Sequence, residues 1–172
     1  ISSKKILKEL LLISNFLKQF SSPVWKVLNK AANTNKVILF EGAQGALLDI
    51  DFGTYPYVTS SNTASGQIFS GTGFGVKKNH RIFGITKAYT TRVGSGPFPT
   101  ELNNEIGDYL IKNGHEFGTV TRRKRRCGWF DLNLVKQSVI ISGITDIVLT
   151  KLDVLDDLDY IKVCIAYKLK NN

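Results

Sequence analysis

Methionine is absent from the 172 residues, and cysteine and histidine occur only twice each. Two cysteines without a CxxC pair argue against both a disulfide framework and a cysteine-rich metal site. Charges interrupt even the apolar stretch Ile6–Ile13, so the sequence predicts neither a membrane span nor a signal peptide. Together these absences favour a cytoplasmic protein with reduced cysteines and no membrane contact.

The few cysteines and histidines offer little chemistry of their own. Cys127 directly follows a basic run, a setting that can lower the pKa of a thiol, but the sequence favours two ordinary reduced cysteines. His80 and His115 lie far apart in polar, Gly/Asn-rich segments and pair with no acidic cluster. We expect both histidines to be surface residues and not metal ligands.

What is present is an ordinary globular composition with a basic excess. Apolar residues make up 42% and charged residues 22%, and the length allows one domain with a buried core. The formal net charge is +9, much of it in Arg122–Arg126, which predicts an anionic partner such as a phosphate-bearing small molecule or a nucleic acid. The chain starts at Ile1, which is consistent with a fragment whose true N-terminus lies elsewhere.

Apolar periodicity and turn residues predict alternating helices and strands. Apolar residues spaced by three or four positions predict helices, and short β-rich apolar runs predict strands. We expect helices at 3–20, 24–32, 103–113 and 132–142, and strands at 36–40, 81–89, 147–149 and 160–167. This alternation predicts an α/β fold with a largely parallel central sheet and flanking helices.

Two polar segments follow the first predicted strand. Glu41–Gly45 (EGAQG) lies at the carboxyl end of that strand, where α/β folds bind ligands, and Gln44 offers an amide for a base edge or a ribose. Thr59–Thr63 (TSSNT) offers hydroxyl donors for phosphate oxygens. A tight surface turn and a solvated loop are the plain alternatives, and neither motif alone decides between them.

The basic run Arg122–Arg126 is more specific. Arginine forks match the planar geometry of carboxylates and phosphates, so hydroxyls followed by arginines suit an amino-acid carboxylate together with a nucleotide phosphate. Such a run is also typical of an RNA-binding patch or of a solvated loop. No aromatic residues alternate with the basic ones, which argues against base stacking on RNA.

Thr150–Asp153 (TKLD) directly follows the predicted strand 147–149, a spacing that resembles the guanine-reading loop of G proteins. The Asp153 carboxylate would accept hydrogen bonds from N1–H and the 2-amino group of guanine, donors that adenine lacks. The Lys151 stem would cover the ring face while its ammonium group stays in water. A plain strand-to-turn junction is the alternative.

Four segments in this order resemble adenylosuccinate synthetase: FEGAQGALLDIDFGTYPYVTSSNT (Phe40–Thr63), KAYTTRVGSGPFPTEL (Lys87–Leu102), RRCGWFDL (Arg125–Leu132) and TKLDVLD (Thr150–Asp156). The likeness runs from about Lys36 to Leu169. It implies part of a P-loop-NTPase-like synthetase fold. It also implies GTP-dependent ligation of L-aspartate to IMP, in which phosphorylation of the IMP 6-oxygen precedes displacement of phosphate by the aspartate amine. The family further implies Mg²⁺, GTP as co-substrate and a cytoplasmic homodimer.

The resemblance assigns roles to individual residues. IMP would be bound by Gln44, Thr59, Val93 and Arg123. Aspartate would be bound by Thr119, Val120, Thr121, Arg122, Arg123, Lys124 and Arg125. GTP would be bound by Arg125, Lys151, Leu152 and Asp153. No catalytic residue and no metal ligand is assigned here, because the family's catalytic aspartate and histidine and its Mg²⁺ ligands are expected in a segment before this chain.

The sequence departs from the family in two ways. The family has a Thr-Gly-Arg pattern where Thr121 is followed by Arg122, so a backbone conformation that needs glycine would be strained here. The phosphate loop and the C-terminal part of the guanine pocket are not in these residues. We therefore expect residues 1–172 to be a single partial domain, an incomplete and inactive fragment. The alternatives are a nucleotide-binding module without catalysis and an RNA-binding domain that uses the basic loop.

Overall fold

The computed structural model describes residues 2–75, 80–118 and 122–168. Contacts divide the chain into two compact units, Ile1–Glu41 with Ile68–Val76 and Gly42–Gln67 with Lys77–Asn172. The prediction of one partial domain over the whole chain stays a prediction. Within the described residues, no helix is both long enough and apolar enough to cross a membrane.

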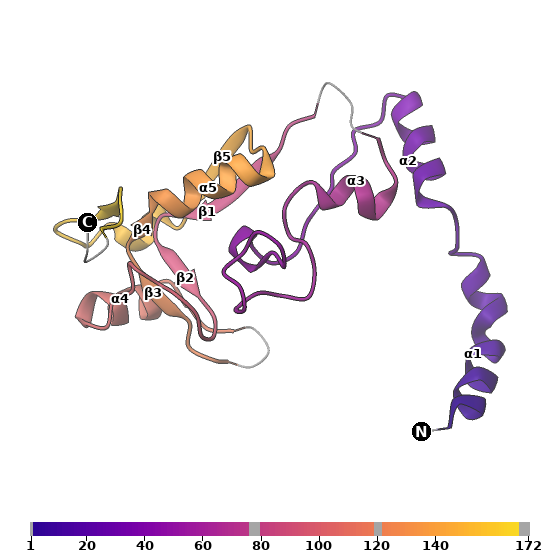
Figure 1. The fold of residues 1–172 in the computed structure, drawn as a ribbon, viewed down its shortest axis with the longest axis horizontal. Helices are drawn as coiled ribbons and strands as arrows, with labels where there is room; N and C mark the ends of the chain where they lie inside the picture. The colour runs from indigo at the N-terminus through magenta and orange to yellow at the C-terminus, as the bar shows by residue number, and fades with distance from the viewer. Residues whose placement is uncertain (1, 76–79, 119–121, 169–172) are drawn as a thin grey trace. The chain divides into compact units, whose positions relative to one another are not determined.

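The first unit is built mainly from helices (Figure 1). The predicted N-terminal helices are confirmed as α1 (Ser3–Lys18) and α2 (Val24–Asn33), and Pro23 takes the N-cap position of α2. Most of the short helix α3 (Gln67–Thr72) also belongs to this unit. None of the three helices contributes a buried residue, so the described residues of this unit form no closed core.

The segment 36–40 is not a strand, contrary to the prediction from its apolar run. The side chains of Val37 and Leu39 are 98% and 85% exposed. A strand needs a neighbour that completes its ladder of hydrogen bonds, and none of the strands in the described residues pairs with this segment. Apolar character alone therefore does not make this segment a strand.

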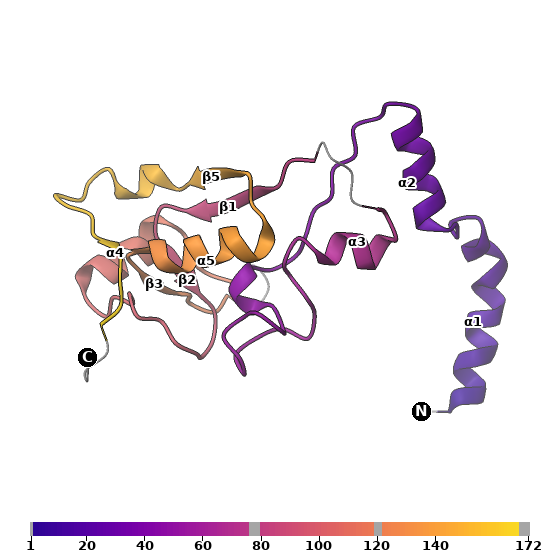
Figure 2. The same cartoon turned by 45° about the horizontal axis from the view of Figure 1, so that its top comes forward.

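The second unit contains three two-stranded sheets in its described residues. Strands β1 (Phe83–Lys87) and β5 (Asp146–Thr150) are parallel, with Lys87 opposite Thr150 at their carboxyl ends. Figures 1 and 2 both show α5 (Leu132–Ser142) beside this pair. The predicted α/β class with parallel strands is confirmed.

The other two sheets are shorter. Strand β2 (Thr90–Arg92) pairs antiparallel with β3 (Arg126–Gly128), which places Arg92 opposite Arg126. Strand β4 (Phe130–Asp131) pairs parallel with β6 (Val163–Cys164), so the strand expected at 160–167 forms over two residues only.

Local capping residues explain where the two helices of this unit begin and end. Asp131 caps α5 by accepting the N–H of Leu134 at 3.2 Å, and Gly143 follows the helix at a φ of +58°, so α5 has the bounds predicted for the helix 132–142. Helix α4 (Glu105–Asn113) ends at Gly114, but with a φ of −75° this glycine is not the left-handed residue. His115 adopts that conformation instead, at a φ of +51°.

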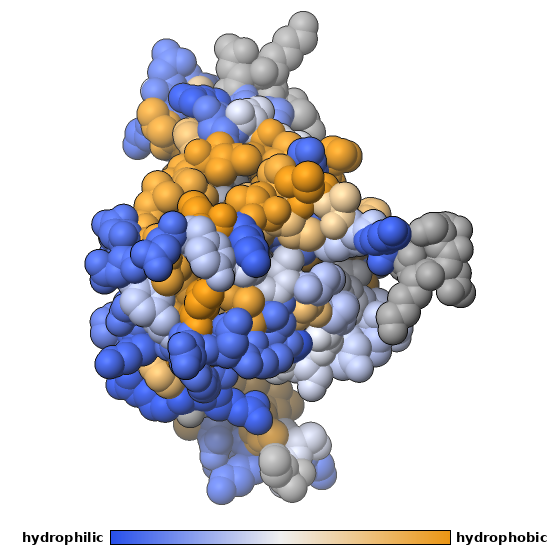
Figure 3. All heavy atoms as spheres, turned by 90° about the vertical axis from the view of Figure 1, so that its left-hand side faces the viewer, coloured by the Kyte–Doolittle hydropathy of each residue, from blue (hydrophilic) through white to orange (hydrophobic). Residues whose placement is uncertain are grey.

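The core lies where α4, β3 and the 3₁₀ turn η2 (Leu152–Leu155) meet, and α4 packs against both of the other elements. Its buried members are Tyr89, Leu110, Ile111, Cys127, Val154 and Leu155. In contrast, the parallel pair keeps apolar side chains in solvent, among them Ile85 at 76% and Ile147 at 53% exposed. Figure 3 shows a broad apolar area on one face of the molecule.

Candidate functional site

Two of the four residues predicted to bind IMP, Gln44 and Thr59, come from separate motifs and are in direct contact. The Nε2 of Gln44 donates to Oγ1 of Thr59 at 2.9 Å, across fifteen positions of sequence. Gln44 has a φ of +65°, and its Oε1 accepts a long hydrogen bond from Ser61 at 3.5 Å. The EGAQG turn and the TSSNT segment therefore form one polar surface with an exposed amide.

A buried carboxylate, which the sequence did not single out, holds this loop together. Asp49 is 0% exposed. Its two oxygens accept five hydrogen bonds of 2.6 to 3.2 Å, from the backbone of Asp51, Phe52, Thr63 and Ala64 and from the Asn62 amide. Burial alone would raise the pKa of Asp49, but the backbone donors outweigh it and hold the pKa well below its usual range. The signal available in the sequence was an Asp between the apolar residues Leu48 and Ile50, a position at which a carboxylate is buried only with hydrogen-bond partners.

Arg92 fastens the same loop to β2. Its Nη2 donates to Oγ1 of Thr54 at 2.8 Å and to the carbonyl of Tyr57 at 3.1 Å, and its Nε donates to the carbonyl of Ser95 at 3.0 Å. Burial and the nearby Arg126 lower the pKa of Arg92 from its ordinary value. Val93 follows directly and is 56% exposed. Arg92 thus ties β2 to the loop at Thr54 and Tyr57, while Val93 stays exposed to solvent.

Most of the basic run is neutralised within the chain. Lys124 pairs with Asp108 at 2.8 Å, and Arg125 pairs with Glu116 at 2.9 Å. Arg126 makes a two-pronged pair with Glu101 at 2.6 and 2.5 Å. Three of the five cations therefore already face carboxylates, which weakens the RNA-binding alternative because counterion release requires free cations.

The other residues predicted to bind aspartate are Thr119–Thr121, which precede the basic run, and Arg122 and Arg123 within it. Thr119, Val120 and Thr121 lie outside the described residues. Arg122 takes a φ of +53°, and its N–H donates to the carbonyl of Gly118 at 2.9 Å. Arg123 is exposed, and within the described residues no hydrogen bond joins its side chain to Gln44 or Thr59. The structure therefore does not by itself bring Arg123 to the Gln44–Thr59 pair.

The TKLD segment lies at the carboxyl end of β5, as expected. Lys151 has a φ of +62°, and its Nζ donates to the carbonyl of Gly114 at 2.8 Å. The prediction that its ammonium group stays in water is therefore wrong. Leu152 is 53% exposed, and Asp153 is exposed in the first turn of η2. No hydrogen bond from the described part of the chain occupies the Asp153 carboxylate. An acceptor therefore faces solvent beside a fixed lysine stem.

A second buried carboxylate was also missed by sequence reasoning. Glu116 is 1% exposed, and Lys87 donates to its two oxygens at 2.7 and 2.8 Å. Tyr89 donates to it at 2.7 Å and Arg125 at 2.9 Å. Burial would raise the pKa of Glu116, but the bonds from Lys87, Tyr89 and Arg125 outweigh it and lower the pKa. Glu116 is thus ionised at neutral pH and faces two cations.

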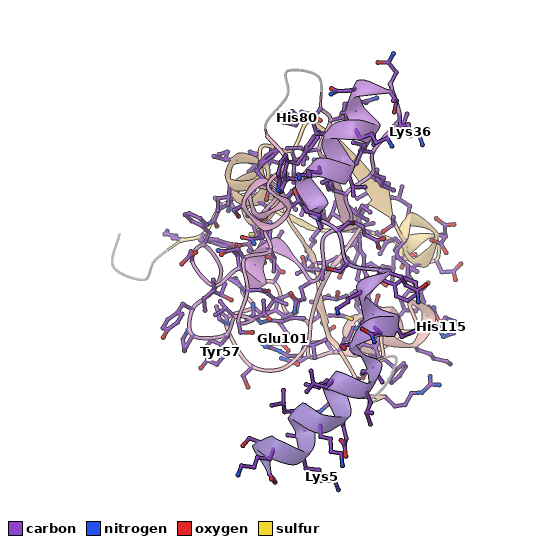
Figure 4. The ribbon with its side chains drawn as sticks, turned by 90° about the vertical axis from the view of Figure 1, so that its right-hand side faces the viewer. Lys5, Lys36, Tyr57, His80, Glu101 and His115 are labelled. Atoms are coloured by element: carbon purple, nitrogen blue, oxygen red, sulfur yellow. The ribbon has the colours of Figure 1, made fainter. Side chains whose placement is uncertain are left out.

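Cysteine and histidine play no visible part in this arrangement. Cys127 is 1% exposed, and burial, with a smaller contribution from Glu116, raises the pKa of its thiol to about 11. The lowering considered from the basic run does not occur, because burial opposes the thiolate more than the cations favour it. Figure 4 shows His80 and His115 well apart, so they do not share a site.

The fold and these segments define an α/β protein whose TKLD turn lies at the carboxyl end of the parallel strand β5, the place where such folds bind ligands. The family model of adenylosuccinate synthetase matches residues 1–172. The chain belongs to the adenylosuccinate synthetase family.

Two solved structures are similar to the chain. The fully ligated adenylosuccinate synthetase of Plasmodium falciparum is 49% identical over 94% of this chain, with a TM-score of 0.84. The succinoaminodeoxyadenylate synthetase of cyanophage S-2L, bound to dGMP and to dATP as an energy donor, is 26% identical over 68% of this chain, with a TM-score of 0.55. The chain spans 38% of the length of each of these two proteins.

Proposed function

We propose that this chain supplies substrate-binding loops of a GTP-dependent ligase that joins L-aspartate to IMP. In this reaction the γ-phosphoryl group of GTP passes to the 6-oxygen of IMP. The aspartate amine then attacks C6, and phosphate leaves with the electrons of the C–O bond, giving adenylosuccinate, GDP and phosphate. Family membership and the arrangement of the loops support this proposal. A homodimer in the cytoplasm that depends on Mg²⁺ is part of the same proposal.

One observation carries the assignment of the GTP side. Two hydrogen bonds end on the short segment from Gly114 to Glu116. Lys151 donates to the Gly114 carbonyl, and Arg125 donates to the Glu116 carboxylate. The candidate guanine reader and the candidate phosphate-binding arginine are therefore held by neighbouring residues. In this proposal Asp153 accepts from guanine N1–H and the 2-amino group, and the Lys151 stem covers the ring.

The IMP and aspartate sides follow from the other contacts. In this proposal Gln44 and Thr59 present an amide and a hydroxyl to the nucleotide, and Val93, exposed directly after β2, lies against its sugar. Arg123 is the exposed arginine of the run. The aspartate carboxylates are assigned to the run from Thr119 to Arg125.

Magnesium is expected from the family, but the residues described here do not suit it. In those residues no group of three or more His, Cys, Asp or Glu side chains could hold a metal ion. The carboxylates Asp49 and Glu116 are both buried and already accept several hydrogen bonds. No step of the proposed reaction is therefore assigned to a metal bound by these residues.

A full-length chimera tests the proposal. Residues 1–172 would replace the matching segment of the P. falciparum enzyme, and adenylosuccinate formation would be measured with IMP, GTP, aspartate and Mg²⁺. Turnover that requires all three substrates is expected, with the parent enzyme as positive control. A folded chimera without turnover would contradict the proposal. The 172-residue chain alone is expected to be inactive, and turnover by it would contradict its being incomplete.

A further inference from the structure

Glu116 has four hydrogen bonds from three side chains but no exposed surface with which to reach a ligand. Its carboxylate is 1% exposed, whereas Lys87 and Arg125 keep 25% and 30% of their side chains exposed. Glu116 therefore acts on any ligand through the two cations. The two positive charges of Lys87 and Arg125 and the one negative charge of Glu116 give this cluster a net charge of +1. Only the two cations are exposed to solvent.

Arg125 is held to Glu116 at two points. Its backbone N–H donates to the Glu116 carbonyl at 2.9 Å, and its Nη1 donates to the carboxylate at 2.9 Å. Phe117 and Lys124 form an antiparallel bridge between the same two segments. A long arginine side chain fixed in this way loses less conformational freedom when it binds an anion, which favours binding.

The surroundings of Glu116 leave room for this arrangement. A β-carbon on Gly114 would lie 2.2 Å from the hydroxyl oxygen of Tyr89, which is the atom that donates to Glu116. Glycine at this position therefore lets Tyr89 reach the carboxylate. The Gly114 carbonyl in turn accepts Lys151, so the same short segment connects the cation cluster to the TKLD turn.

We propose that Glu116 is a positioning residue, whose carboxylate fixes Arg125 and Lys87 so that they present their positive charge to an anionic group of a substrate. The proposal rests on the proposed ligase function. The anionic group is a phosphate of GTP or a carboxylate of aspartate, because Arg125 is assigned to both. The Gly114 carbonyl also accepts a hydrogen bond from Lys151 of the guanine turn. A substitution of Glu116 that displaces this segment would therefore also displace Lys151.

The test uses the full-length chimera and the variants Glu116→Gln, Glu116→Asp, Arg125→Ala and the double variants that combine them. Glu116→Gln is expected to raise KM for GTP or for aspartate about tenfold, and the affected substrate identifies the anion. KM for IMP is expected to change less than about twofold, because Gln44 and Thr59 form a separate contact. In the Arg125→Ala background, Glu116→Gln is expected to have a clearly smaller effect on the affected KM, because only the contribution through Lys87 remains.

A purely structural role gives a different pattern. It would raise KM for all three substrates together, or add its full effect in the Arg125→Ala background, and either result overturns the proposal. If Glu116→Gln does not fold, Glu116→Asp takes its place, because it keeps the charge but shortens the side chain. The same KM values are then compared with and without Arg125→Ala. Tyr89→Phe is the matched control, because it removes one neutral donor and keeps both cations paired. An inactive unmodified chimera would refute the ligase function itself and this proposal with it.

Discussion

Arg122 donates its backbone N–H to the carbonyl of Gly118 at 2.9 Å while its own φ is +53°. This is the left-handed region, which a side chain makes costly and glycine occupies freely. The family pattern Thr-Gly-Arg places glycine at this position. The strain expected from the sequence therefore has a concrete geometric basis.

Replacing Arg122 by glycine is expected to relax this turn. In the chimera, KM for aspartate should fall while KM for GTP changes little, and the free energy of unfolding should rise by about 1 kcal/mol. Arg122→Ala is the control, because it removes the guanidinium but keeps the β-carbon and hence the strain. An unchanged or higher KM for aspartate in Arg122→Gly would show that arginine suits this loop.

Asp153→Asn is expected to weaken the use of GTP. An amide accepts through one oxygen only and directs its NH₂ towards a guanine donor, and one unpaired buried donor costs about 1–3 kcal/mol. KM for GTP should therefore rise by roughly one to two orders of magnitude. Xanthosine triphosphate has a carbonyl in place of the 2-amino group and should recover part of the activity.

The neighbouring Asp156 provides the control for this change. It is exposed and follows η2, so Asp156→Asn should leave nucleotide kinetics unchanged. KM for IMP should also stay constant in Asp153→Asn. Equal damage to IMP and GTP kinetics would mean that Thr150–Asp153 is a structural turn.

Asp49→Asn is expected to loosen the loop that carries Gln44 and Thr59. The amide has one oxygen for five donors, and losing charge-assisted bonds costs about 2–3 kcal/mol in unfolding free energy. KM for IMP should rise about tenfold or more while KM for GTP changes little. Asp51→Asn is the control, because Asp51 is exposed and, among the residues that the structure describes, its side chain accepts only from Asn62. Similar effects of both substitutions would contradict the organising role of Asp49.

The same carboxylate predicts a pH dependence. Because the pKa of Asp49 is held below its ordinary value of 3.8, the folded protein binds fewer protons there than the unfolded chain. Its stabilisation is complete above about pH 4–5 and is lost as the pH falls further. Urea unfolding between pH 7 and pH 3 should therefore show a steeper loss for the unmodified chain than for Asp49→Asn. Parallel curves would show that Asp49 does not titrate differently in the two states.

Cys127 is expected to resist alkylation. It is 1% exposed with a thiol pKa of about 11, whereas Cys164 is only partly buried. At pH 8, iodoacetamide followed by mass spectrometry should modify Cys164 well before Cys127. Both should react at similar rates in the unfolded chain, which is the control. Rapid labelling of Cys127 in the folded chain would show that its thiol is neither buried nor protonated.

Local sequence signals predicted α1, α2, α4 and α5 but missed the short helix α3. Asp131 and Gly143 flank α5 at the bounds predicted for the helix 132–142, because an aspartate cap and a glycine end act through backbone groups a few residues away. The segment 36–40 shows the limit of such signals. Its apolar run is typical of a buried strand, but strand formation depends on a partner elsewhere in the chain, which no local pattern contains.

The sequence by itself determined the family, through four motifs in a fixed order, and it predicted which loops between Gln44 and Asp153 would bind substrates. Only the tertiary structure decided which charges remain available. Asp49 and Glu116 look like ordinary surface acids in the sequence, and the basic run looks like a free cationic patch. Folding buries these two carboxylates, gathers distant donors around them and pairs three of the five cations. The reason is that hydrogen bonding and desolvation depend on which residues meet in space, and that is set by the packing of α4, β3 and the polar loops.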